Sequence, residues 1–174
     1  MLTGMHRILV SACLLGHPVR YNGLDKKTDD DHLRRWVAEG RVVSVCPEVA
    51  GGLPVPRPPA EITGGGADGG VAVLGGVARV IAVTGADVTA EFVQGADHAL
   101  AKAAEHGIRV AVLKEGSPSC GSSYSCDGSF SGARVPAPGV TTARLLAAGI
   151  RVFSEHELAA ADAWLRALDE AATD

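Results

Sequence analysis

Apolar residues along this chain gather in short continuous runs that alternate with stretches of helical periodicity. The runs are rich in Val, Ile and Leu and predict buried β-strands at 7–12, 41–45, 108–113 and 150–153. Apolar positions at helical spacing predict helices at 29–39, 87–106, 141–148 and 155–172. Apolar strands separated by helices are typical of a parallel sheet that is covered on both faces. We therefore predict a three-layer α/β fold, in which a Rossmann-like, mostly parallel sheet carries helices on both faces.

One long stretch, 50–70, interrupts this pattern. It contains four closely spaced prolines, which predict irregular structure: Pro54, Pro56, Pro58 and Pro59. A linker of about 20 residues is unusual inside a small domain. We interpret the stretch as a functional loop that wraps a site. The segments 71–74 and 77–83 after it predict a short hairpin or two extended pieces.

The composition narrows the class of protein. The 174 residues, 47% of them hydrophobic, predict one globular domain over residues 1–174 and exclude a disordered chain. The formal net charge is −4 and aromatic residues make up 4%, which disfavours nucleic acid as a partner. No run reaches the roughly 18 apolar residues that a membrane span needs. We expect a small-molecule partner and no membrane, in a monomer or a homodimer.

The segment Val10–Cys13 is similar to a bacterial lipoprotein cleavage site. A signal peptide needs an apolar run of about 7–15 residues before that site, whereas only three residues separate Arg7 from Ser11. We interpret the segment as the end of a buried strand and expect a cytoplasmic protein. Its four cysteines then lie in a reducing compartment, where metal binding or reactive thiols are more frequent than disulfides.

Three of the cysteines follow predicted strands. Cys13 comes after the first strand, Cys46 directly after the second, and Cys120 seven residues beyond Leu113. Ligands of an open parallel sheet bind beyond the carboxyl ends of its strands, so these thiols are expected to meet at one edge. The absence of a C-x-x-C pair excludes zinc-ribbon, thioredoxin and bacterial ferredoxin patterns. Spacing alone leaves open both the metal and the alternative that each cysteine is a small buried apolar residue.

Polar residues near these cysteines are candidates for chemistry. Glu48 lies two residues after a cysteine and is a candidate general acid or base, or else a solvated loop acid. Arg57 lies between prolines and is a candidate for holding an anionic or carbonyl ligand, or else forms an ion pair with Glu48 or Glu61. The Gly/Ser-rich loop 116–123 has main-chain amides that can cradle an anion or a cluster sulfide.

Taken together, the motifs resemble the thiouracil desulfidase family, in the same order over about residues 7–154. Six motifs carry the resemblance: Val10–Gly16, Cys46–Val49, Pro56–Ile62, Thr84–Thr89, Ser117–Gly121 and Asp127–Phe130. So many motifs in one order make the resemblance specific, and it implies a single-domain member of the family.

The resemblance implies a [4Fe-4S] cluster held by only three cysteines, Cys13, Cys46 and Cys120, with one open iron. That iron would bind a thiocarbonyl sulfur and act as a Lewis acid, while water adds to the carbon and sulfide is released without net redox change. The substrate would be a thiolated pyrimidine such as thiouracil, or a similar thioamide. The roles of the remaining residues are also implied: protons for Glu48, a hydrogen bond from Ser117 or Ser119 with Ser117 preferred, and closure over the substrate for Arg57.

Cys126 departs from the family pattern, because relatives more often carry a large apolar residue or Tyr beside Asp-Gly. We expect Cys126 to lie near the site without binding the cluster. Two alternatives to a desulfidase remain open at this point. The first is a metal-free sulfurtransferase or thiol hydrolase with Cys120 as its nucleophile. The second is a non-catalytic module that senses iron or redox state.

Overall fold

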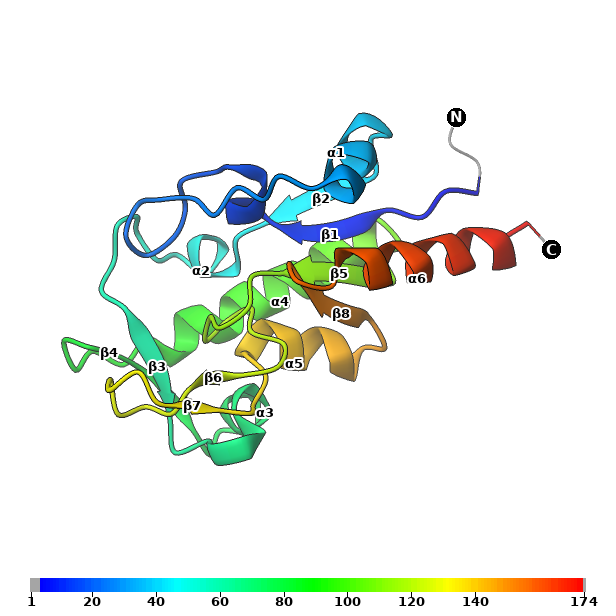
Figure 1. The fold of residues 1–174 in the computed structure, drawn as a ribbon. Helices are drawn as coiled ribbons and strands as arrows, with labels where there is room; N and C mark the ends of the chain where they lie inside the picture. The colour runs from blue at the N-terminus through cyan, green and yellow to red at the C-terminus, as the bar shows by residue number, and fades with distance from the viewer. Residues whose placement is uncertain (1–3, 174) are drawn as a thin grey trace.

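Four strands form one parallel sheet in the computed structural model, which describes residues 4–173 (Figure 1). In spatial order they are β2 (Val42–Val45), β1 (Ile8–Ser11), β5 (Val110–Leu113) and β8 (Arg151–Ser154). Every adjacent pair runs in parallel. The predicted α/β fold with a parallel sheet is confirmed.

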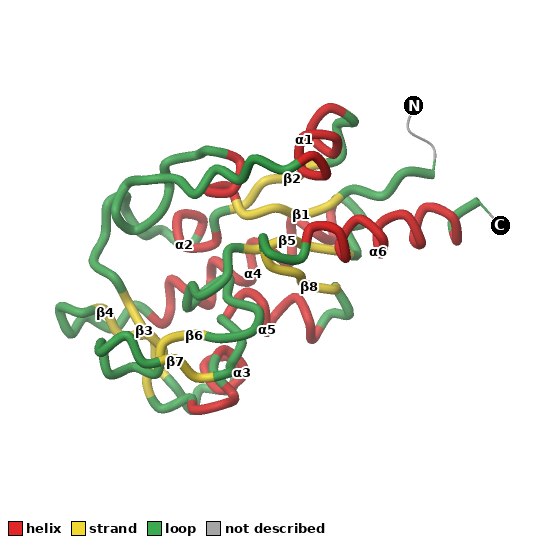
Figure 2. Tube along the Cα trace, in the orientation of Figure 1, coloured by secondary structure: helices red, strands yellow, loops and turns green. Residues whose placement is uncertain are grey.

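Helices cover both faces of this sheet (Figures 1 and 2). Successive side chains of a strand point to opposite faces, which explains why the runs are apolar throughout. On one face, Ile8 and Val10 share a core with α1 (Asp31–Ala38) and α6 (Leu158–Ala171). On the other face, Leu9 shares a core with residues of α4 (Thr89–Glu105) and α5 (Val140–Ala147).

A second group of elements lies beyond the carboxyl ends of the strands (Figure 1). It contains an antiparallel pair, β3 (Ala60–Thr63) with β4 (Arg79–Ala82), and a second short pair, β6 (Ser125–Cys126) with β7 (Arg134–Val135). It also contains α3 (Gly70–Leu74). Ile62 and Val80 form a core cluster with Phe92 and Val140, which fastens this group to α4 and α5.

Two sequence predictions are wrong in this second group. The segment 71–74 is helical rather than extended, because a short apolar run does not distinguish a strand from a buried helix. The absence of a side chain at Gly70 lets α3 approach α5, since a Cβ there would lie 2.2 Å from the Gly139 carbonyl oxygen. In the stretch predicted as irregular, β3 forms after the last proline, Pro59, where every residue retains the N–H that strand pairing needs.

The remaining short elements surround the edge of the parallel sheet. They are a 3-10 turn η1 (Ala12–Leu15), the helix α2 (Pro47–Ala50) and a second 3-10 turn η2 (Gly66–Asp68). The central strand β1 has β2 on one side and β5 on the other, so the chain reverses its direction of winding at β1. Ligands bind at such a switch point, outside the carboxyl ends of the strands. Within residues 4–173, no helix combines the length and apolar character needed to cross a membrane.

Candidate active site

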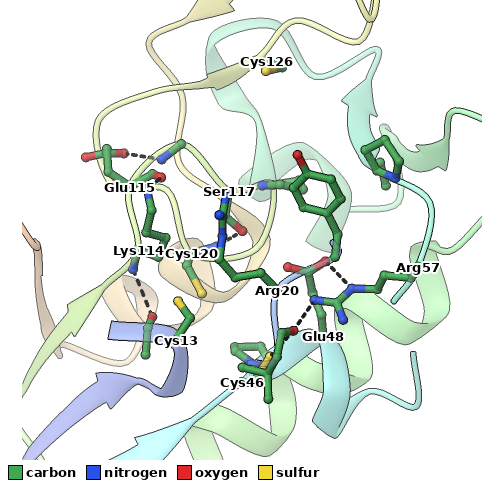
Figure 3. Close-up of a pocket in the computed structure, with 18 of the residues that line it drawn as sticks. Cys13, Arg20, Cys46, Glu48, Arg57, Lys114, Glu115, Ser117, Cys120 and Cys126 are labelled. Atoms are coloured by element: carbon green, nitrogen blue, oxygen red, sulfur yellow. Dashed lines mark hydrogen bonds and ion pairs between the residues drawn. The ribbon is translucent and has the colours of Figure 1, made fainter. Parts of the chain in front are cut away.

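A cavity of about 340 Å³ opens at this switch point, beyond the carboxyl ends of β1, β2 and β5 (Figure 3). Every site residue predicted from the sequence except Ser119 lines it, namely Cys13, Cys46, Glu48, Arg57, Ser117 and Cys120. These residues come from three separate parts of the chain. The parallel sheet therefore brings together what the sequence keeps far apart.

Three of the lining thiols are presented by three different local structures. Cys13 lies in the 3-10 turn that follows β1, Cys46 directly precedes α2, and Cys120 lies in the loop that leaves β5. Figure 3 shows their sulfur atoms on one side of the cavity. Burial and the neighbouring Cys46 thiol raise the pKa of Cys13 to about 11. Burial, followed by the nearby Cys13, also raises the pKa of Cys120, so the free chain holds these thiols protonated.

Cys126 lies apart from the three other thiols. It also lines the cavity, but Figure 3 shows it on the opposite side. Burial raises the pKa of Cys126, and the charged groups that influence it are Glu61, Arg134 and Asp127 rather than any of the other cysteines. The geometry is thus that of three grouped thiols and one separate thiol.

The three grouped thiols fit a multinuclear cluster better than a single ion. Between residues 4 and 173, no three His, Cys, Asp or Glu side chains converge closely enough to hold one metal ion. A tetrahedral zinc site needs four ligands within about 2.3 Å of one atom. An iron–sulfur cluster instead takes each thiolate on a different iron atom, so its ligands stand farther apart. Three free thiols around one cavity are a donor set that suits such a cluster.

Cys120 lacks the surroundings of a nucleophilic thiol. Its side chain is buried, with the residue 5% exposed, and its pKa is raised by that burial. Reactive cysteines are accessible and have a lowered pKa. The arrangement therefore argues against the metal-free thiol enzyme that the sequence leaves open.

Glu48 reaches the cavity because two glycines let α2 lie directly against α4. A Cβ on Gly95 would stand 2.0 Å from the Pro47 carbonyl oxygen, and a Cβ on Gly51 would stand 1.9 Å from the Glu91 carbonyl oxygen. Burial raises the pKa of the Glu48 carboxyl, although the Arg57 guanidinium and a hydrogen bond with Ser117 oppose the rise. A carboxyl group held in this way can carry a proton near neutral pH.

Arg57 is buried, and each of its guanidinium nitrogens has a protein partner. Nε donates to Glu48 at 3.2 Å, and the two terminal nitrogens donate to the Pro54 and Val19 carbonyl oxygens at 3.1 and 3.0 Å. Its main-chain N–H also donates to the Tyr21 carbonyl oxygen at 2.7 Å. Arg57 thereby joins the proline-rich loop to the segment carrying Tyr21, which lines the cavity. The ion pair with Glu48 was one of the sequence alternatives, and substrate binding by Arg57 stays a prediction.

The loop that carries Cys120 is docked on the start of α5. Thr142 Oγ1 donates to the Cys120 carbonyl oxygen at 3.0 Å, and Thr141 Oγ1 shares a hydrogen bond of 3.0 Å with Ser119 Oγ. Gly139 allows this contact, since a Cβ there would lie 2.4 Å from the Ser119 carbonyl oxygen. Ser119 is 1% exposed, and substrate binding by its hydroxyl stays a prediction.

The main-chain amides of loop 116–123 are engaged within the protein. Ser117 Oγ accepts the N–H groups of Ser119 and Cys120, at 3.1 and 3.2 Å. The carboxylate of Glu115 accepts those of Gly116, Ser122 and Ser123, at 2.8 to 3.1 Å to Oε1. The loop does cradle an anion, as its sequence indicates, but that anion is the side chain of Glu115.

Several contributors to the site escaped the sequence analysis. Lys114 Nζ forms an ion pair with Glu155 at 2.9 Å, and the Lys114 N–H donates to Ser11 Oγ at 3.0 Å. These residues each stand at or just after the carboxyl end of a strand. The rule that identified the cysteines would also have identified them. Arg20 and Tyr124 line the cavity as well, but they lie in irregular segments for which the sequence gives no signal.

Comparisons with known proteins agree on one family. The sequence model of a family described as 2-thiouracil desulfurase matches residues 8–157. A Bacillus subtilis (strain 168) protein, uncharacterized protein YbbK, is 46% identical over 151 residues, which are 87% of this chain and 97% of that protein. The solved structure of a [4Fe-4S]-dependent thiouracil desulfidase, TudS, is 48% identical with a TM-score of 0.84. It covers 92% of this chain and 98% of its own.

Proposed function

The chain belongs to the 2-thiouracil desulfurase family, and on this premise we propose that it is a [4Fe-4S]-dependent desulfidase. The family resemblance carried by the six motifs is thereby confirmed. The reaction converts the thiocarbonyl group of a thiolated pyrimidine such as thiouracil, or of a similar thioamide, into a carbonyl group and releases sulfide. The observation that carries the proposal is the grouping of three strand-end thiols around a cavity that also contains Glu48.

Cys13, Cys46 and Cys120 would hold the cluster. They are the three thiols on one side of the cavity, and Cys126 on the other side leaves one iron without a protein thiolate. When bound, the cluster supplies a Lewis-acidic iron with an affinity for soft thiocarbonyl sulfur. The thiolates it needs are stable in a reducing compartment, which agrees with a cytoplasmic location for a chain with four free cysteines.

Glu48 manages the protons of the reaction. Overall, one water adds its oxygen to the thiocarbonyl carbon, the C–S bond breaks, and sulfur departs as hydrosulfide with one proton remaining. The Glu48 carboxylate takes a proton from the attacking water and returns it to the departing sulfur or to solvent. Its place in the cavity wall and its partly buried side chain, 18% exposed, suit this alternation between base and acid.

Ser117 and Arg57 position Glu48 from two sides. Arg57 holds one carboxylate oxygen at 3.2 Å, and Ser117 contributes a hydrogen bond to the same side chain. The Ser117 hydroxyl already accepts two main-chain N–H groups, so its own proton is available to Glu48 or to a substrate heteroatom. We propose that this hydroxyl donates to the substrate while Glu48 transfers the proton.

Anaerobic purification followed by iron and acid-labile sulfide analysis tests the proposal. The expected result is about four iron atoms and four sulfides per chain, together with release of sulfide from 2-thiouracil under anaerobic conditions. A chain that takes up no iron even after reconstitution would overturn the cluster assignment. A chain that holds the cluster and turns over no thiolated pyrimidine or thioamide would favour the sensing module instead.

A further inference from the structure

Glu115 is a buried anion whose charge is directed at the loop that carries Cys120. The residue is 6% exposed, and Figure 3 shows its carboxylate pointing away from the three grouped thiols. Oε2 accepts the Ser122 hydroxyl at 2.7 Å, in addition to the three main-chain N–H groups held by Oε1. A carboxylate that accepts several hydrogen bonds in this way is placed for a structural purpose rather than for contact with a substrate.

The loop requires such a fixed point because of its composition. Residues 116–123 contain four serines and two glycines, a composition that behaves as a flexible coil when nothing restrains it. The carboxylate of Glu115 binds the first residue of the loop and the last two, and so draws its two ends together. Cys120 lies inside the closed loop.

The base of the loop is fixed separately to the parallel sheet. The N–H of Glu115 donates to Glu155 at 2.8 Å, and Glu155 directly follows β8. Lys114 Nζ binds both Glu155 and the Glu115 carbonyl oxygen, at 2.9 and 2.7 Å. The Glu115 carboxylate therefore sits between a rigid strand end and a loop that would otherwise be mobile.

We propose that Glu115 is a positioning residue for the cluster, one that fixes the Cys120 loop before the metal binds. The inference rests on the proposed function, because it takes Cys120 to be a cluster ligand. Preorganised ligands hold a metal group more tightly, since less order has to be imposed on the chain when it binds. The role is distinct from catalysis, and Glu115 is not expected to alter the KM of the loaded protein.

Cluster release and amide exchange test the proposal together. Glu115→Gln and Glu115→Ala are loaded anaerobically, and iron loss to a ferrous chelator is followed beside the unaltered chain. Loss of charged hydrogen bonds is expected to speed release about tenfold or more. The matched control is Asp162→Asn, which alters a buried carboxylate between α1 and α6, remote from the cavity. It is expected to lower the melting temperature and leave the release rate unchanged.

A second measurement on the unaltered apoprotein does not depend on any variant folding. Hydrogen exchange of the Gly116, Ser122 and Ser123 amides is expected to be slow, and to become fast in Glu115→Gln at conditions where the fold persists. Parental release rates in both Glu115 variants, or fast exchange in the unaltered chain, would overturn the proposal. A chain without any cluster would instead overturn the proposed function, and the exchange data would still show whether Glu115 orders the loop.

Discussion

The Ser117 hydroxyl oxygen accepts the main-chain N–H of Cys120 at 3.2 Å, so one side chain touches both the thiol loop and the carboxyl group of Glu48. The proposed cluster ligand and the proposed proton carrier are therefore coupled through a single hydroxyl. A displacement of either one would be felt by the other. Rigid packing of this kind keeps the reacting groups aligned.

Replacing Ser117 with Ala removes this shared hydroxyl. We expect sulfide release from 2-thiouracil to fall about 10- to 100-fold, because a hydrogen bond to a charged group is lost. The measurement is kcat per loaded cluster. Ser123→Ala in the same loop is the control, because only its main-chain N–H is used and its side chain is exposed. Equal activity of the two variants would contradict the role given to Ser117.

The four cysteines are expected to separate into two classes. Serine in place of Cys13, Cys46 or Cys120 should abolish stable iron binding, since each removes one of three thiolate ligands. Serine in place of Cys126 should leave iron and sulfide per chain unchanged. Metal analysis after anaerobic reconstitution measures both. Loss of iron from the Cys126 variant would show that the fourth thiol is a ligand.

Glu48→Gln preserves the shape of the side chain and removes its ability to exchange a proton. We expect kcat for sulfide release to fall by about 10²- to 10⁴-fold, the usual contribution of a general acid or base. Iron content should not change, because Glu48 lines the cavity without being a ligand. Glu105→Gln on the exposed side of α4 is the control for loss of one negative charge. Parental kcat in Glu48→Gln would remove Glu48 from the mechanism.

The grouping of the thiols could be predicted from the sequence because it follows from a local signal. Cys13 and Cys46 stand immediately after apolar runs, and the geometry of a parallel sheet does the rest. The same reasoning did not find α3, where the close approach of Gly70 to Gly139 decides the structure. That contact joins residues far apart in sequence, and no local pattern records it.

The partner of the loop amides was equally out of reach. The Gly/Ser composition of 116–123 correctly indicated that amides would gather around an anion, but it could not say that Glu115 is that anion. Choosing between an internal carboxylate and a bound ligand requires the path of the chain. Short strands such as β6 and β7, with two residues each, carry no periodicity to recognise.

Gly95 is expected to be essential for the placement of Glu48. In Gly95→Ala the added Cβ would stand 2.0 Å from the Pro47 carbonyl oxygen, so α2 has to move away from α4. We expect a loss of about 1–3 kcal/mol in the free energy of unfolding and a fall in kcat. Gly75→Ala is the matched control, since its nearest contact would be an ordinary 3.5 Å. Urea unfolding and sulfide release measure the two effects, and a parental kcat would separate α2 from catalysis.

Asp162 should make stability depend on pH in the acid range. It lies between α1 and α6, where it accepts Trp36 Nε1 at 2.9 Å and forms ion pairs with Arg35 and Arg166. Burial opposes its ionisation, but the hydrogen bonds from Trp36 and Arg35 prevail and hold the pKa of Asp162 below its ordinary 3.8. A lowered carboxyl pKa stabilises the fold above the unfolded value, and this contribution is lost as the pH falls through the folded value.

Asp162→Asn is therefore expected to be about 1–3 kcal/mol less stable than the unaltered apoprotein at neutral pH. The difference should shrink as the pH falls below 3.8, where the unaltered carboxyl also becomes protonated. Glu115 and Asp169 titrate in the same direction, and Glu48, with its raised pKa, in the opposite one. Because both proteins share these groups, subtracting their urea unfolding free energies at each pH isolates Asp162. A difference that stays constant down to the acid limit would mean that Asp162 acts through packing rather than charge.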